Sequence, residues 1–282
     1  MPDGNYSDGV TSGRVDLDTV SFQYFEKGEG PDLLWIPAGD QTGDVFFELF
    51  SYFTDTHRCL SYNPRGAGDT VCADSPPWRI EDLAADCAAF IEKVCKPPVI
   101  VAGLSMGALV IQELAMSYPH LIRIAIPMGT IAKKTGFARE WEESEILFAE
   151  KGGSLPPDLA VIHYAILSYP SEVLGDDELW KKCRPYVSGA YEERDPAMLA
   201  AQWRACMEYD SSTRLPDCKV PMHVISFSHD LQTPPSRGRK VAELAGNGHF
   251  HLLEGLGHYS MYGHRPGDVA GCIRKIIDSE AG

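Results

Sequence analysis

Residues 103–107 read Gly-Leu-Ser-Met-Gly, and they place a serine where a chain could use it for chemistry. An apolar run at 99–102 precedes the serine, and apolar residues at helical spacing follow it from 109 to 115. Glycines two residues to either side of Ser105 leave room for a strand to turn directly into a helix. Such a turn exposes the hydroxyl and points the first helical amides at charge that develops beside it. We therefore predict that Ser105 is a nucleophile.

A serine nucleophile needs a base and an acid that orients the base. His258 follows the last predicted strand in a loop, 254–260, whose glycines allow the imidazole to reach across the sheet. Asp230 follows the strand-like segment 224–229, and the prolines after it prevent that strand from continuing. The chain order Ser105, Asp230, His258 is that of nucleophile-elbow enzymes and not of chymotrypsin or subtilisin. The spacing thus predicts a catalytic triad.

The other histidines have structural explanations. His264 is the nearest rival as a base, but it precedes an Arg-Pro pair that opens a predicted helix, so we expect it at the surface. His249 and His251 alternate along a predicted strand, His223 opens another strand, and His163 lies on a predicted helix. The His-Phe-His pair suggests metal binding, yet no carboxylate or cysteine lies at ligand spacing along the chain. The sequence therefore predicts neither a metal nor a cofactor.

These residues need a scaffold, and the hydrophobic pattern predicts a parallel sheet covered by helices on both faces. Buried-type strands alternate with amphipathic segments up to about residue 130, and the alternation returns after 209. Between 131 and 209 the pattern indicates helices joined by Gly and Pro turns. We predict an α/β fold with a core formed by 1–130 and 210–282. The segment 131–209 is predicted as a helical cap over the carboxyl ends of the strands, where such sheets bind ligands.

Composition limits the partners. The chain has 282 residues, a net charge of −15 and a pI near 5.0, which disfavours nucleic acid and favours a small molecule. No apolar stretch reaches the roughly 18 residues that span a bilayer, and the polar N-terminus resembles no signal peptide. The eight cysteines lack paired spacing and are expected as reduced thiols of a cytoplasmic protein without membrane contacts. The oligomeric state stays open, with a homodimer among the options.

Several loops together resemble one known family. The segment 63–70, Asn-Pro-Arg-Gly-Ala-Gly-Asp-Thr, and the loops at 229–235 and 255–260 resemble those of α/β-hydrolase fold enzymes, and the likeness extends over nearly the whole chain. The run 103–130 is most similar to bacterial ester hydrolases, polyketide methylesterases and non-haem haloperoxidase (perhydrolase) relatives. This resemblance implies a serine hydrolase that uses no cofactor.

The resemblance also implies an oxyanion hole formed by the backbone N–H groups of Met106 and Gly39. Where many members of the family carry His-Gly after the third strand, this chain has Pro-Ala followed by Gly39 and Asp40. A carboxylate aimed at an oxyanion would oppose catalysis. Asp40 must therefore point away, be protonated, or indicate a different reaction.

The candidate substrate-binding residues are Asp40, Trp203 and Tyr259. Most aromatic residues of the cap are expected to pack its own core, and the acidic run 139–145 to form a solvated helix face. These aromatic residues are Tyr164, Tyr169, Trp180, Tyr186, Tyr191, Trp203 and Tyr209. The function we expect is hydrolysis of an ester or lactone of a small to medium, largely apolar substrate. Carbon–carbon bond hydrolysis, perhydrolysis and a ligand-binding sensor on the same fold remain the alternatives.

Overall fold

A computed structural model describes residues 6–39, 41–188 and 195–280. Its strands form one nine-stranded sheet in the order β1-β2-β4-β3-β6-β7-β8-β9, with β5 paired to β2. The strands from β4 to β9 along this order run parallel, whereas β2 is antiparallel to β1, β4 and β5. The strands are β1 (Thr11–Asp16), β2 (Val20–Lys27), β3 (Asp32–Ile36), β4 (Arg58–Tyr62), β5 (Val71–Cys72), β6 (Val99–Leu104), β7 (Ile122–Met128), β8 (Met222–Phe227) and β9 (Gly248–Leu253).

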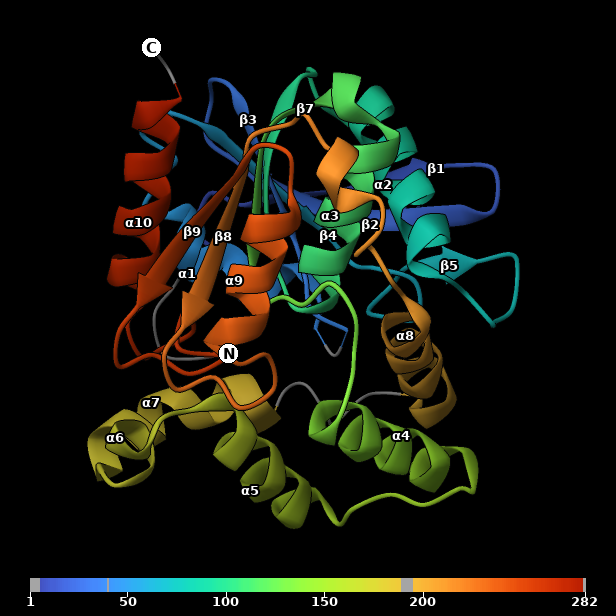
Figure 1. The fold of residues 1–282 in the computed structure, drawn as a ribbon, viewed down its shortest axis with the longest axis vertical. Coiled ribbons are helices and arrows are strands. Elements are labelled where there is room, and N and C mark those ends of the chain that lie inside the picture. The colour runs from blue at the N-terminus through green and yellow to red at the C-terminus, as the bar shows by residue number, and fades with distance from the viewer. Residues whose placement is uncertain (1–5, 40, 189–194, 281–282) are drawn as a thin grey trace.

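Helices cover both faces of the sheet, which confirms the predicted α/β class (Figure 1). On β3, Leu34 and Ile36 pack into the core beneath α2, α3 and α9, while Leu33 and Trp35 pack into the core beneath α1 and α10. Successive side chains of β3 thus pack alternately into two cores, as a sheet buried on both faces requires. The helices of the sheet domain are α1 (Phe47–Phe50), α2 (Ile80–Val94), α3 (Met106–Ser117), α9 (Pro235–Leu244) and α10 (Pro266–Ser279).

Five further helices separate β7 from β8, and we call residues 137–208 the helical insertion. They are α4 (Phe137–Glu150), α5 (Pro157–Ser168), α6 (Ser171–Leu174), α7 (Asp177–Ser188) and α8 (Pro196–Glu208). The insertion lies at the end of the molecule toward which the arrowheads of β8 and β9 point (Figure 1). It therefore faces the carboxyl ends of these strands.

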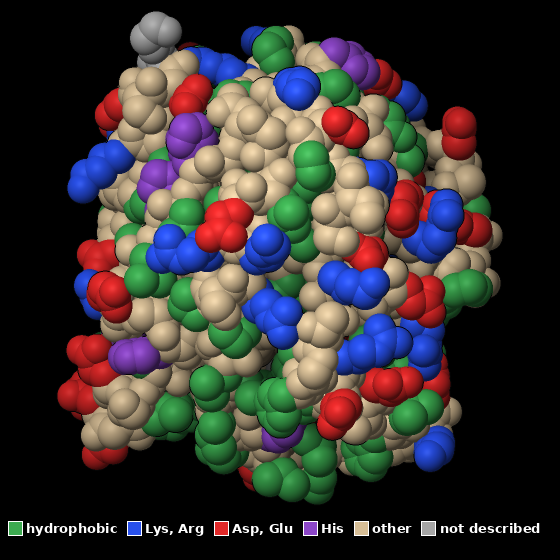
Figure 2. Space-filling view, in the orientation of Figure 1, with side chains coloured by type: hydrophobic (Ala, Val, Ile, Leu, Met, Phe, Trp, Pro, Cys, Tyr) green, Lys and Arg blue, Asp and Glu red, His purple; other side chains and the backbone are tan. Residues whose placement is uncertain are grey.

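The outer side of the insertion exposes hydrophobic side chains. Figure 2 shows such side chains gathered at the bottom of the molecule, where Figure 1 places α5. On α5 the exposed residues repeat at helical spacing, and they are Leu159, Ile162 and Ile166. All eight cysteines are free thiols, as the sequence predicted. Within the described ranges no helix is long and apolar enough to span a membrane.

Candidate active site

Ser105 occupies a strained turn between β6 and α3. Its backbone angles are φ 55° and ψ −113°, and it is the one non-glycine residue with positive φ in the described part of the chain. Strain of this kind costs on the order of 1–3 kcal/mol and persists where the surrounding structure enforces it. A Cβ atom on Gly103 would lie 2.6 Å from the Ile36 carbonyl oxygen, and one on Gly107 would meet the same oxygen. The two glycines therefore allow α3 to pass close to β3 while Ser105 is held at the bend.

The structure brings Asp230 and His258 together in a buried hydrogen bond. Asp230 lies just beyond β8, and its Oδ2 atom is 2.6 Å from Nδ1 of His258. The carboxylate also accepts hydrogen bonds from the backbone amides of Gln232 and Thr233, at 2.9 and 2.8 Å, and from the Thr233 hydroxyl at 2.7 Å. These donors fix the carboxylate, which in turn fixes the imidazole with Nδ1 toward Asp230.

The other imidazole nitrogen, Nε2 of His258, is buried and has no hydrogen-bond partner among the described residues. Ser105 and His258 line the same cavity, which measures about 60 Å³ as the space open to the centre of a water molecule. That volume holds several water molecules. The ring therefore offers its second nitrogen to a cavity that the serine shares, and catalytic hydrogen bonds commonly tighten only when substrate binds.

The two predicted oxyanion donors lie next to each other at this cavity. Met106 is the first residue of α3, so its amide has no carbonyl to bond within the helix. Gly39 also lines the cavity, and a Cβ atom there would lie 3.5 Å from Sδ of Met106 and 3.6 Å from Trp203. Asp40 lies outside the described residues, so its predicted role receives no structural account here.

Trp203 and Tyr259, the other two predicted substrate-binding residues, line the same cavity. Tyr259 also stacks on His258 with ring centroids 5.7 Å apart. Of the remaining aromatic residues predicted for the cap, Tyr164 reaches the cavity, whereas the hydroxyl groups of Tyr169, Tyr186 and Tyr209 bond elsewhere in the protein. Tyr191 falls outside the described residues.

Two expectations from the sequence were wrong. His264 is buried, and its Nδ1 atom lies 3.0 Å from the Ser260 hydroxyl, because the loop before α10 folds inward. The acidic run 139–145 is not a uniformly solvated face. Glu140 and Glu143 are exposed, but Glu142 is buried and Glu142 and Glu145 line the cavity. The reason is that α4 turns this side toward the space above Ser105 instead of toward water.

Sequence reasoning also missed Thr233 and Lys134, which both line the cavity. The Thr233 hydroxyl lies 3.3 Å from Nδ1 of His258 as well as bonding Asp230. On α4 the cavity-facing positions are 138, 141, 142 and 145. That spacing is one helical face, so the pattern was readable, but the sequence alone does not show what lies opposite it.

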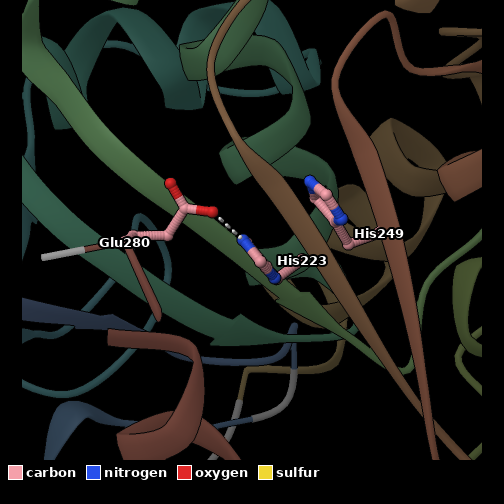
Figure 3. A group of neighbouring side chains, drawn as sticks. All are labelled: His223, His249 and Glu280. Carbon is pink, nitrogen blue, oxygen red and sulfur yellow. Dashed lines mark hydrogen bonds and ion pairs between the residues drawn. The ribbon is translucent and has the colours of Figure 1, made fainter. Parts of the chain in front are cut away.

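A group of side chains that could hold a metal ion lies outside the cavity lining. It consists of His223 on β8, His249 on β9 and Glu280 after α10, with ligand atoms within 4.8 Å of one another (Figure 3). No carboxylate stands at ligand spacing from these histidines along the chain, because Glu280 is distant in sequence. The donor types suit zinc. However, the rings of His223 and His249 stack with planes 14° apart, so their in-plane lone pairs run side by side instead of converging.

As it stands, this group is part of a hydrogen-bonded chain that joins α10 to the sheet. His223 bonds Glu280 through Nε2 at 3.0 Å and His251 through Nδ1 at 3.1 Å. Burial lowers the pKa of both His223 and His251, so that neutral rings are favoured. The cluster therefore anchors the C-terminal helix, with hydrogen bonds that neutral rings can make.

Comparison with known proteins agrees with this fold. A model of the alpha/beta hydrolase family matches residues 33–271. A relative from Mycobacterium tuberculosis, provisionally named the non-heme bromoperoxidase BpoC, is 25% identical over 92% of this chain and 98% of its own. The 3-oxoadipate enol-lactonase 2 of Acinetobacter baylyi is 24% identical, with 86% of each chain covered. The crystal structure of the enol-lactonase from Burkholderia xenovorans shares the fold, with a TM-score of 0.84 at 19% identity over 94% of this chain and 100% of that one.

Proposed function

Because the chain belongs to the alpha/beta hydrolase family, we propose that it hydrolyses an ester or lactone of a small molecule through an acyl-enzyme on Ser105. The observation that carries this proposal is the shared cavity: a strained serine, and a histidine fixed by a buried carboxylate with its second nitrogen unpartnered. The names of the bromoperoxidase and enol-lactonase relatives support a hydrolase or perhydrolase chemistry. The helical insertion acts as the cap that closes the cavity.

The reaction follows from the positions of these groups. Nε2 of His258 accepts the proton of the Ser105 hydroxyl as Oγ attacks the substrate carbonyl carbon. Asp230 stabilises the imidazolium that results. The amides of Met106 and Gly39 donate to the oxyanion, and the imidazolium then protonates the departing alkoxide. A water molecule, deprotonated by His258, releases the acid and restores the serine.

The direct test is the substitution Ser105→Ala, assayed with p-nitrophenyl acetate and p-nitrophenyl butyrate. Turnover should disappear while the circular dichroism spectrum stays unchanged, because the hydroxyl fills no core volume. A fluorophosphonate probe should label the wild type on Ser105 and leave the variant unlabelled. Ser144→Ala, at an exposed serine on α4, is the matched control and should keep full activity. Full activity of Ser105→Ala would refute the proposed nucleophile.

The same assays separate the competing functions. A perhydrolase would form peracid from hydrogen peroxide and acetate faster than it hydrolyses acetate esters. A sensor would release one equivalent of nitrophenol and then stop. A carbon–carbon hydrolase would leave simple esters nearly untouched and cleave a β-diketone instead. Sustained ester or lactone turnover that exceeds these activities supports the proposal.

A further inference from the structure

The cavity has a second polar region, which contains the charged side chains of Lys134, Glu142 and Glu145. Lys134 lies between β7 and α4, and its side chain is 13% exposed. Burial lowers the pKa of its ammonium from the usual 10.5 to about 8, while nearby Cys206 and Glu145 act in the opposite direction. A buried lysine is costly, and such groups gather at functional sites. The triad mechanism described above does not use it.

Lys134 has more hydrogen-bond donors than partners among the described residues. Its ammonium carries three N–H donors, and the one hydrogen-bond or ion-pair partner that the described residues give it is the carboxylate of Glu142, which is 6% exposed. Because Lys134 lines the cavity, the other donors are available to whatever fills that space. The ammonium of Lys134 can therefore donate a hydrogen bond to an acceptor in the cavity.

Glu145, by contrast, is already supplied with donors. Its Oε1 atom lies 3.0 Å from Nε1 of Trp141 and 2.6 Å from Nε2 of His163, and its Oε2 atom accepts from the Tyr164 hydroxyl at 3.3 Å. These contacts leave the carboxylate charge in place but use its main acceptor positions. A cationic substrate group thus finds the main acceptor positions of Glu145 already occupied.

The charge of this region excludes a carboxylate ligand. Lys134 contributes one positive formal charge, whereas Glu142 and Glu145 contribute two negative ones. Even with His163 protonated, the sum rises only to zero. A substrate carboxylate would gain one hydrogen bond to Lys134 and meet two carboxylates, at short range and out of bulk water. A neutral oxygen makes the same hydrogen bond without that repulsion.

We propose that Lys134, held by Glu142, binds a neutral oxygen acceptor on the substrate, a ketone, amide or hydroxyl oxygen other than the ester carbonyl. The inference rests on the proposed hydrolase function and narrows its substrate class. The preferred substrate is then an oxygenated ester or lactone and not a plain alkyl ester. Apolar side chains, among them Leu109 and Ile131, line the same cavity and can contact the carbon chain of the substrate.

The test compares p-nitrophenyl hexanoate with its 4-oxo and 5-oxo analogues and with the p-nitrophenyl monoester of adipate. The wild type should favour one oxo ester over hexanoate by about tenfold in kcat/KM, as expected for a hydrogen bond to a charged donor. It should discriminate against the adipate monoester. In Lys134→Met the ratio of oxo ester to hexanoate should fall to nearly one.

Lys133→Met is the matched control, because Lys133 is the adjacent lysine, 55% exposed and paired with Asp210 at 2.6 Å. It should keep the wild-type ratio. Lys134→Leu, which also lacks a donor, provides a second variant if the methionine disturbs folding. Equal rates on oxo ester and hexanoate in the wild type, or an unchanged ratio in both Lys134 variants, would overturn the proposal. So would a preference for the adipate monoester.

A binding measurement separates this inference from the proposed function. Calorimetry of the Ser105→Ala protein with 4-oxo- and 5-oxohexanamide against hexanamide should show about tenfold tighter binding of one oxo amide. Adding Lys134→Met to that protein should remove the difference. If no ester is turned over but this difference persists, the hydrolase proposal fails and the Lys134 subsite stands. If esters are turned over but the amides bind alike, the subsite fails alone.

Discussion

The two polar regions of the cavity are built on different principles. At the first, which we call the Ser105 end, the groups of the proposed triad come from turns and loops at the strand ends, and buried backbone amides and glycines hold them in place. At the second, the Lys134 end, long charged side chains contact one another across α4 and the preceding segment. In the proposed reaction, the first end fixes atoms within the tolerance that bond-making needs. In the proposed subsite, the second end selects by charge and hydrogen bonding, which tolerates movement, and the following predictions test this division.

The largest effect is expected from Asp230→Asn. The backbone amides of Gln232 and Thr233 will hold the new side-chain oxygen, so the amide nitrogen will face Nδ1 of His258. That places the imidazole proton on Nε2, where it prevents proton acceptance from serine. We expect kcat to fall on the order of 10⁴-fold, as in related triads. Stopped-flow assays measure the loss, and Asp217→Asn, at an exposed carboxylate, is the control. A loss below about tenfold would place the acid elsewhere.

A smaller loss is expected from Gly39→Val. The new branched side chain would meet Met106 and Trp203 and displace the loop amide from the oxyanion position. Losing one donor should lower kcat by roughly 10² to 10³ with little change in thermal stability. Gly271→Val, where an added Cβ atom meets nothing within 4 Å, controls for the substitution itself. Wild-type kcat in Gly39→Val would remove this loop from the oxyanion hole.

The Lys134 end should also show itself in the pH dependence of stability. Below pH 8 the lysine is charged in both the folded and unfolded states, so the folded state carries its burial cost. Between pH 8 and 10.5 the folded state loses the proton first, and this cost disappears. The free energy of unfolding of the wild type, minus that of Lys134→Met, should therefore rise with pH across this window. Urea titrations at pH 7 and pH 10.5 measure the difference, and a flat or falling one contradicts the assignment.

The smallest expected effect is that of Glu142→Gln, and it tests directly whether the Lys134 end selects by charge. Glu142→Gln keeps the side-chain shape but removes the charge that balances Lys134. The cavity should then accept a carboxylate better, with kcat/KM for the adipate monoester rising about fivefold relative to hexanoate, an effect on the order of 1 kcal/mol. The exposed Glu143→Gln should leave the ratio unchanged. Equal changes for both esters would mean that Glu142 has a structural role alone.

The sheet and the Ser105 end were predictable from sequence because their signals are local. The amphipathic pattern of α2 (Ile80–Val94) is visible in its own residues, and the glycines around Ser105 mark a bend that few backbones can make. Similarly, β8 ends at Phe227, shortly before Asp230, and the two prolines beyond Asp230 open α9, so that a loop holds the acid. Each of these signals depends on the chain's own conformation within a few residues.

The remaining features depend on what lies opposite a residue in space. Whether Glu142 faces water or a cavity is decided by the position of α4 over the sheet, which periodicity does not give. The partnership of His223 with Glu280 joins a strand to the end of a distant helix. The inward turn of His264 likewise arises from packing, with Ser260 as its partner. A sequence shows which face of an element is polar, but not its neighbour.

The pairing of β7 with β8 has a consequence for when the proposed site is completed during synthesis. The two strands pair side by side, at Ala125 with Met222 and at Met128 with Ile225, although the whole insertion separates them along the chain. Ser105 belongs to the part made before the insertion, and Asp230 and His258 to the part made after it. Under the proposed mechanism, the polypeptide emerging from a ribosome therefore has its nucleophile before its base. A chain truncated before His258 should show no turnover, so turnover would report that the strands after the insertion have docked.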